Sequence, residues 1–125
     1  MTPLEQQFEL LKANYPEAAL TPLPSGAGLV VVAAVRLPPG WSQAATTVKF
    51  LAPVGYPFSK PDCFWADAQL RLRGDAMPQS TNMTPIPETG ESLLWFSWHT
   101  AQWNPNRDTL LTYFNVIKNR LREPR

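Results

Sequence analysis

The chain of 125 residues contains one cysteine and one histidine. A single cysteine cannot form a disulfide within the chain, which excludes a small secreted domain held together by disulfides. Cys63 and His99 lie far apart in the sequence with no second cysteine or histidine near either, so the spacing of a zinc motif is absent. No glycine-rich phosphate loop or dinucleotide fingerprint occurs. We therefore expect no cofactor and no metal site.

Charge and long hydrophobic runs are also scarce. Charged residues make up 17% of the chain and the net charge is +1. Lys and Arg are scattered rather than clustered, which argues against a nucleic acid or an anionic membrane as the main partner. No apolar run approaches the roughly 18 residues of a membrane span. The first residues are polar and lack the hydrophobic region of a signal peptide, so we expect a cytoplasmic protein.

Prolines and tryptophans are abundant, with 14 and 5 copies, and hydrophobic residues make up 44%. The prolines lie between apolar segments, which indicates short elements with rigid connections rather than disorder. A chain of this length can bury a core without metals or disulfides. We expect residues 1–125 to form a single domain.

The first segment predicts a helix over residues 3–14. Thr2 and Glu5 have the spacing of a capping box, and Pro3 suits the first helical position. Tyr15 precedes Pro16, which ends the helix. Apolar side chains recur at helical spacing on one face, at Leu4, Phe8 and Leu11.

Four segments separated by proline and glycine turns predict β-strands. They cover residues 17–23, 29–37, 46–51 and 63–65. Short connections favour antiparallel pairing, so we expect a four-stranded antiparallel meander and an α+β fold. Residues 67–92 show no periodicity and predict a long loop, after which residues 93–99 form another apolar segment.

The last segment predicts a helix over residues 108–122, with Asp108 as the N-cap. Lys118, Arg120 and Arg122 in the last turns suit the negative end of the helix dipole. The expected buried stripe consists of Leu110, Phe114, Ile117 and Leu121.

Two motifs give the chain a likeness to a known family. Tyr56-Pro57-Phe58 with Pro61 forms a stiff corner, and Trp103-Asn104-Pro105 forms a turn before the last helix. In this order they resemble the ubiquitin-conjugating enzyme (E2, UBC-like) fold. Together with Pro61–Trp65 and Trp98-His99, they look like prokaryotic E2 family E. The resemblance covers most of the chain. It implies partners in a bacterial pathway, namely a ubiquitin-like protein, an E1-like adenylating enzyme and a JAB-type isopeptidase.

The sequence departs from the E2 pattern at the catalytic position. An E2 enzyme carries ubiquitin on a cysteine about eight residues before the tryptophan of the Trp-x-Pro turn. Counting back from Trp103 leads to Trp95, and the His-Pro-Asn motif is absent as well. Cys63 falls in the predicted strand after the corner, where we expect a buried thiol of raised pKa.

Three functional hypotheses follow. The first is an E2-like protein that binds a ubiquitin-like protein or an E1-like enzyme without thioester chemistry, with Phe58, Trp98 and His99 as contact residues. The second is an unconventional conjugating enzyme that uses Ser97, with His99 as the base, or Cys63. The third is an interaction module of the RWD type, which shares the corner but usually lacks the Trp-x-Pro turn.

Overall fold

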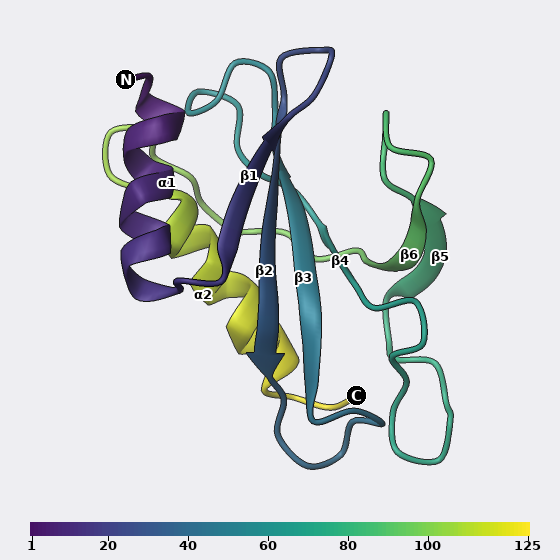
Figure 1. Ribbon diagram of the computed structural model, residues 1–125. Helices are drawn as coiled ribbons and strands as arrows, with labels where there is room; N and C mark the ends of the chain where they lie inside the picture. The colour runs from purple at the N-terminus through teal and green to yellow at the C-terminus, as the bar shows by residue number, and fades with distance from the viewer.

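A six-stranded antiparallel sheet carries both helices on one of its faces (Figure 1). The computed structural model describes residues 1–125. The fold is α+β, with a helix, a sheet and a second helix in that order, as expected for a UBC-like chain. The elements are α1 (Pro3–Asn14), β1 (Ala18–Pro22), β2 (Gly28–Arg36), β3 (Ala45–Ala52), β4 (Phe64–Ala66), β5 (Thr81–Pro85), β6 (Ser92–Phe96) and α2 (Leu110–Leu121).

The strand order in the sheet is β1-β2-β3-β4-β6-β5. The first four strands follow one another as the predicted antiparallel meander. The last two form a hairpin, in which β6 pairs with β4 and leaves β5 at the edge. This hairpin lies on the side of the sheet away from α1 (Figure 1).

Strand β5 corrects the prediction of a long irregular loop over residues 67–92. Its five residues are mostly polar and exposed, and Pro85 ends the strand. Edge strands need neither a buried face nor an apolar alternation, so hydrophobic periodicity gave no signal for β5. Its backbone pairing with the apolar β6 forms the strand.

The main core fills the space between the sheet and the two helices. Alternate strand residues point toward the helices, among them Val30, Phe50 and Phe96. A smaller apolar group covers part of the opposite face around Leu29 and Trp65. The alternation of inward and outward residues follows the period of two along each strand.

Helix α1 has the predicted start and end. The Thr2 side chain accepts a hydrogen bond from the Glu5 N–H, and the Glu5 carboxylate accepts one from the Thr2 N–H. Phe8 and Leu11 are its buried residues.

Helix α2 begins later than predicted, with Thr109 rather than Asp108 as the N-cap. The Asp108 carboxylate instead accepts a hydrogen bond from the Asn104 N–H at 2.7 Å, and this bond closes the turn before the helix. Arg120, which the sequence places in the last turns near the negative end of the helix dipole, is 2% exposed. Its guanidinium lies over the Phe96 ring, with 5.2 Å from Cζ to the ring centroid. An aromatic pocket in the tertiary structure therefore overrides the helix-end position.

The two sequence motifs are in direct contact. The indole N–H of Trp103 donates to the Pro57 carbonyl at 2.7 Å. The Tyr56 and Trp103 rings lie 6.0 Å apart, and the Tyr56 hydroxyl bonds the Gln7 side chain of α1. The corner, the Trp-x-Pro turn and α1 therefore form one packed end of the molecule.

Candidate functional site

The start of β4 and the end of β6 bring two loop segments together. Because these strands pair antiparallel, residues before β4 lie beside residues after β6. The Cys63 N–H donates to the Trp98 carbonyl at 3.1 Å, which continues the pairing beyond both strands. Asp62 and Cys63 consequently lie next to His99.

These three side chains form a cluster in which one ligand atom from each lies within 4.8 Å of the others. His99 Nδ1 is 2.5 Å from Asp62 Oδ1 and 3.9 Å from Cys63 Sγ. Both contacts involve the same ring nitrogen. An ionised carboxylate only accepts hydrogen bonds, so a nitrogen that bonds it carries the hydrogen. In this arrangement His99 Nδ1 is not available to take a proton from Cys63.

The cluster lies at the surface, with its sulfur on the inner side. The His99 and Asp62 side chains are 56% and 51% exposed. Cys63 is 7% exposed, which confirms the expectation of a buried cysteine. Its position beside His99 was not predicted, because the two loops are neighbours only through the pairing of β4 with β6.

The surroundings of Cys63 disfavour a thiolate. Burial raises the pKa of the Cys63 thiol above its ordinary value of 9.0, and the nearby Asp62 carboxylate adds to this effect. A carrier cysteine needs the opposite environment, in which positive charge or a helix N-terminus stabilises the anion. The geometry therefore favours a protonated, unreactive thiol.

The backbone at Cys63 is held in an uncommon conformation. Its φ is 62°, in the left-handed region, which costs about 1–2 kcal/mol for a residue with a Cβ. The hydroxyl of Tyr113, on α2, donates to the Cys63 carbonyl at 2.9 Å. Helix α2 and the end of β6 thus fix the direction of the Cys63 side chain.

Ser97 lies one residue beyond β6, because the strand in the predicted apolar segment 93–99 ends at Phe96. Its N–H donates to the Ser80 carbonyl at 2.8 Å, on the side of the β5 segment. No hydrogen bond joins Ser97 to His99, whose ring partners are Asp62 and Cys63. The use of Ser97 as a nucleophile stays a prediction.

The two aromatic candidates for partner contacts differ in exposure. Phe58, in the proline corner, is 81% exposed. Trp98 is half-buried, and its ring lies under the guanidinium groups of Arg120 and Arg125, with Cζ 5.5 Å and 5.6 Å from the ring. Phe58 therefore presents an apolar surface in the free protein, whereas most of Trp98 is already used in packing.

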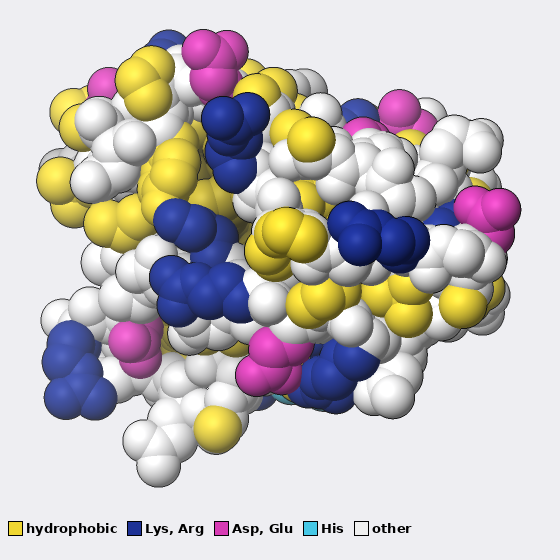
Figure 2. Space-filling view, turned by 90° about the horizontal axis from the view of Figure 1, so that it is seen from below, with side chains coloured by type: hydrophobic (Ala, Val, Ile, Leu, Met, Phe, Trp, Pro, Cys, Tyr) yellow, Lys and Arg dark blue, Asp and Glu magenta, His cyan; other side chains and the backbone are white.

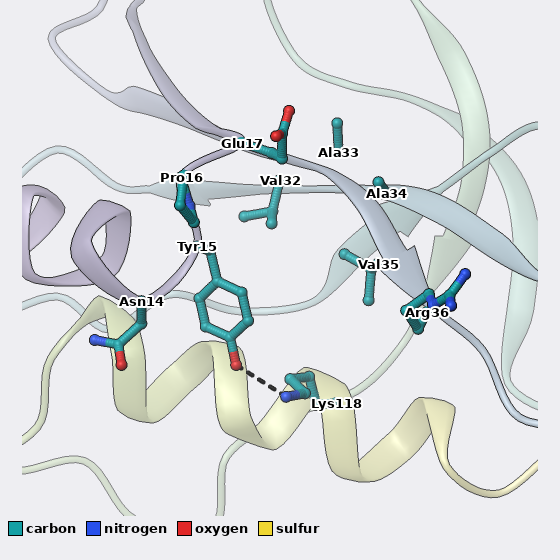
Figure 3. A pocket seen from close by; sticks show the side chains of 10 residues that line it. All are labelled: Asn14, Tyr15, Pro16, Glu17, Val32, Ala33, Ala34, Val35, Arg36 and Lys118. Atoms are coloured by element: carbon teal, nitrogen blue, oxygen red, sulfur yellow. Dashed lines mark hydrogen bonds between the residues drawn. The ribbon is translucent and has the colours of Figure 1, made fainter.

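A hollow lies away from this cluster, between the end of α1, β2 and α2 (Figure 3). Its volume is about 270 Å³. Two of its lining residues are joined by a hydrogen bond, in which the Lys118 ammonium donates to the Tyr15 hydroxyl at 2.9 Å. Figure 2 shows Lys and Arg side chains spread over the lower face with acidic, apolar and neutral groups among them.

The comparison with protein families decides the identity of the fold. The model of prokaryotic E2 family E matches residues 11–124, nearly the whole chain. The chain belongs to prokaryotic E2 family E. This family has an E2-like role in a prokaryotic ubiquitin-like protein pathway, and its members interact in general with ubiquitin-like proteins or E1-like enzymes.

No curated protein and no solved structure matches the chain. Neither helix has the length and hydropathy that a membrane span requires. The match is to the E2 family, the first of the two families that the motifs resemble.

Sequence reasoning missed Asp62 as a partner of His99. Asp62 and Cys63 precede one strand and His99 follows another, so they are neighbours only if β4 and β6 pair. Both strands are recognisable in the sequence as apolar segments. Because β5 lies between them in sequence, the order of the segments does not indicate that they pair.

Proposed function

We propose that this family E member is an E2-like protein that binds a ubiquitin-like protein, an E1-like enzyme or both, without carrying the ubiquitin-like protein as a standard thioester. The observation that supports this proposal is the environment of Cys63, the one cysteine of the chain. Its thiol is buried, its pKa is raised, and the ring nitrogen nearest to it bonds Asp62.

The packed end of the molecule supports noncovalent binding. Phe58 is 81% and Val54 59% exposed, both near the corner that Trp103 holds through the Pro57 carbonyl. Aromatic side chains, phenylalanine among them, are enriched in the buried centres of protein interfaces. We place the partner contact at Phe58, with His99 and the exposed edge of Trp98 as further contacts.

Binding to a purified ubiquitin-like protein and to an E1-like enzyme of the same genome tests this proposal by calorimetry. The proposal requires that Cys63→Ser bind with the affinity of the wild-type chain. Phe58→Ala should weaken binding at least about fivefold, corresponding to a loss of roughly 1 kcal/mol or more. Met77→Ala is the matched control, because Met77 is a large apolar side chain, 45% exposed, outside the corner.

If neither protein binds the wild-type chain, the proposal fails. It also fails if Phe58→Ala and Met77→Ala have the same effect, since the contact surface would then lie elsewhere.

The contact between Cys63 and His99 favours a second candidate, an unconventional conjugating enzyme. A Sγ to Nδ1 distance of 3.9 Å would allow proton transfer if the Asp62 carboxylate released His99. The Cys63 sulfur would then attack the thioester carbonyl of the charged E1-like enzyme, and the enzyme's thiol would leave with the proton. A thiol-labile adduct lost in Cys63→Ser would establish this route.

Ser97 is the alternative nucleophile for the same candidate. An oxyester resists thiols but is cleaved by hydroxylamine, so an adduct of that kind lost in Ser97→Ala would implicate the serine. Both adduct tests need the E1-like enzyme, the ubiquitin-like protein and ATP.

A further inference from the structure

The Asp62–Cys63–His99 cluster has the donor atoms of a transition-metal site. It offers one carboxylate oxygen, one sulfur and one imidazole nitrogen, all within 4.8 Å of one another. Thiolate and imidazole ligands suit zinc, whereas calcium and magnesium take oxygen ligands almost alone. Three protein ligands with an open fourth position are the ligand number of many zinc sites that bind water or a substrate.

The distances fit a tetrahedral ion after small movements. Zinc bonds of about 2.0–2.3 Å at tetrahedral angles place two ligand atoms about 3.3–3.6 Å apart. The sulfur-to-nitrogen distance is 3.9 Å and the nitrogen-to-oxygen distance is 2.5 Å. The first must shorten and the second lengthen, and the sulfur-to-oxygen distance, which is at most 4.8 Å, must come to the same range. The half-exposed Asp62 and His99 side chains are free to make this change.

We propose that Asp62, Cys63 and His99 bind one Zn²⁺ ion through Oδ1, Sγ and Nδ1, with a fourth position open to water or to a donor atom of a bound partner. The ion takes the place of the hydrogen between His99 and Asp62. It also supplies the positive charge that a buried thiolate lacks in this environment.

Two hydrogen bonds of its backbone hold Cys63, the central ligand of the proposed zinc site, in place. The Cys63 N–H donates to the Trp98 carbonyl, and the Cys63 carbonyl accepts from the Tyr113 hydroxyl. Hydrogen bonds around a metal ligand fix its orientation and strengthen the site. A bound ion would join the start of β4 to the segment after β6 and so reinforce the pairing that creates the site.

The zinc site and the proposed function share His99, but each can fail without the other. Metal binding is measured on the isolated chain, so its failure leaves partner binding untouched. Equally, a chain that binds zinc but no ubiquitin-like protein would retain the site and lose the function.

Cobalt titration of the metal-free full chain tests the site. Co²⁺ replaces Zn²⁺ in tetrahedral sites, and a sulfur ligand gives a charge-transfer band in the near ultraviolet. The proposal predicts saturation at one Co²⁺ per chain with intense visible bands, followed by loss of the spectrum when Zn²⁺ is added. Cys63→Ser should abolish the charge-transfer band. His99→Ala and Asp62→Asn should each weaken binding by more than the roughly 10–100-fold that the loss of an outer-shell group costs.

Asp75→Asn is the matched control for Asp62→Asn. Asp75 is exposed, lies in another loop and has no side-chain hydrogen bond, and asparagine tolerates its φ of 70°. This variant should bind Co²⁺ as the wild-type chain does.

Because Cys63→Ser changes a buried position, thermal unfolding supplies a second measurement. Zn²⁺ should raise the midpoint of the wild-type chain and of Asp75→Asn, but not that of His99→Ala, whose altered side chain is half-exposed. The absence of saturable binding in the wild-type chain overturns the proposal. Undiminished Co²⁺ binding in any one of the Asp62, Cys63 or His99 variants does so as well.

Discussion

A thiol carries an acyl group when it ionises and when a thioester can reach it. Cys63 is buried, its pKa is raised, and its neighbour His99 bonds Asp62. Both conditions are therefore unfavourable in the free protein. The reactivity of the Cys63 thiol therefore depends on its burial and on its neighbours, and not on the residue type alone.

Burial of Cys63 predicts slow modification by a thiol reagent. In the native metal-free chain the thiol should react at least about tenfold more slowly than in the denatured chain, since reaction requires an exposed thiolate. The release of a coloured thiol from an aromatic disulfide reagent measures both rates. Equal rates would show that the sulfur is open to solvent in the native protein.

Removal of the Tyr113 hydroxyl should destabilise the site locally. Tyr113→Phe leaves the buried Cys63 carbonyl without its donor at 2.9 Å, which should cost about 1–3 kcal/mol of unfolding free energy. Tyr15→Phe is the control, because its hydroxyl bonds the half-buried Lys118 and should cost less than about 1 kcal/mol. Urea unfolding followed by fluorescence measures both. Equal losses would contradict a specific role for the bond to Cys63.

At the scale of elements, the start of α1 was predictable because its signals are local. Thr2, Pro3 and Glu5 act within one turn, and the structure contains the capping box that their spacing predicts. Strand β5 was not predictable, because its existence depends on pairing with β6 rather than on its own residues. The N-cap of α2 moved by one residue, from Asp108 to Thr109, for a similar reason, since the Asp108 carboxylate bonds the turn before the helix.

The capping box predicts a pH dependence of helix α1. Hydrogen bonds from Thr2 lower the pKa of the Glu5 carboxyl below its ordinary value of 4.5. A lowered pKa in the folded state contributes stability above the unfolded value, and this contribution is lost as the pH falls through the folded value. Glu5→Gln should therefore lose less stability on acidification than the wild-type chain.

Thermal unfolding between neutral pH and about pH 3 measures this difference. Glu9→Gln is the control, because Glu9 lies on the same helix outside the capping box. An identical pH dependence of wild type and Glu5→Gln would exclude a contribution from the cap.

At the scale of the whole molecule, Arg120 connects parts that are far apart in sequence. Its guanidinium donates to the backbone oxygens of Gln79, Glu123 and Arg125 and lies among aromatic rings. Burial lowers the pKa of Arg120, and its Nε has no hydrogen-bond partner. No sequence pattern distinguishes this arginine from the exposed one two residues later, so only the packed structure assigns its role.

Arg120→Ala should lower the free energy of unfolding by about 2–4 kcal/mol, because it removes a large buried side chain and its three acceptors lose their donors. Arg122→Ala should change it by less than about 0.5 kcal/mol, since Arg122 is exposed and its side chain bonds only Asn119. Chemical denaturation of both variants measures the difference. A mild effect at Arg120 would mean that the aromatic pocket repacks without it.

The candidate site shows the same limit of sequence reasoning on a larger scale. Cys63 and His99 were recognisable as the sole residues of their kinds, and the buried state of Cys63 followed from the apolar residues after it. Their contact, and the part of Asp62 in it, depends on the non-sequential order β4-β6-β5 of the sheet. Membership of prokaryotic E2 family E indicates the pathway. The burial of the Cys63 sulfur is the reason to expect that the chain binds a ubiquitin-like protein rather than transfers it.

Intact mass of the chain after incubation with the E1-like enzyme, the ubiquitin-like protein and ATP tests the central claim most directly. The mass is measured without reducing agent. We expect the unmodified mass of the chain, while the E1-like enzyme in the same mixture carries the ubiquitin-like protein. A mass increased by one ubiquitin-like protein, removed by a thiol and absent in Cys63→Ser, would contradict the account.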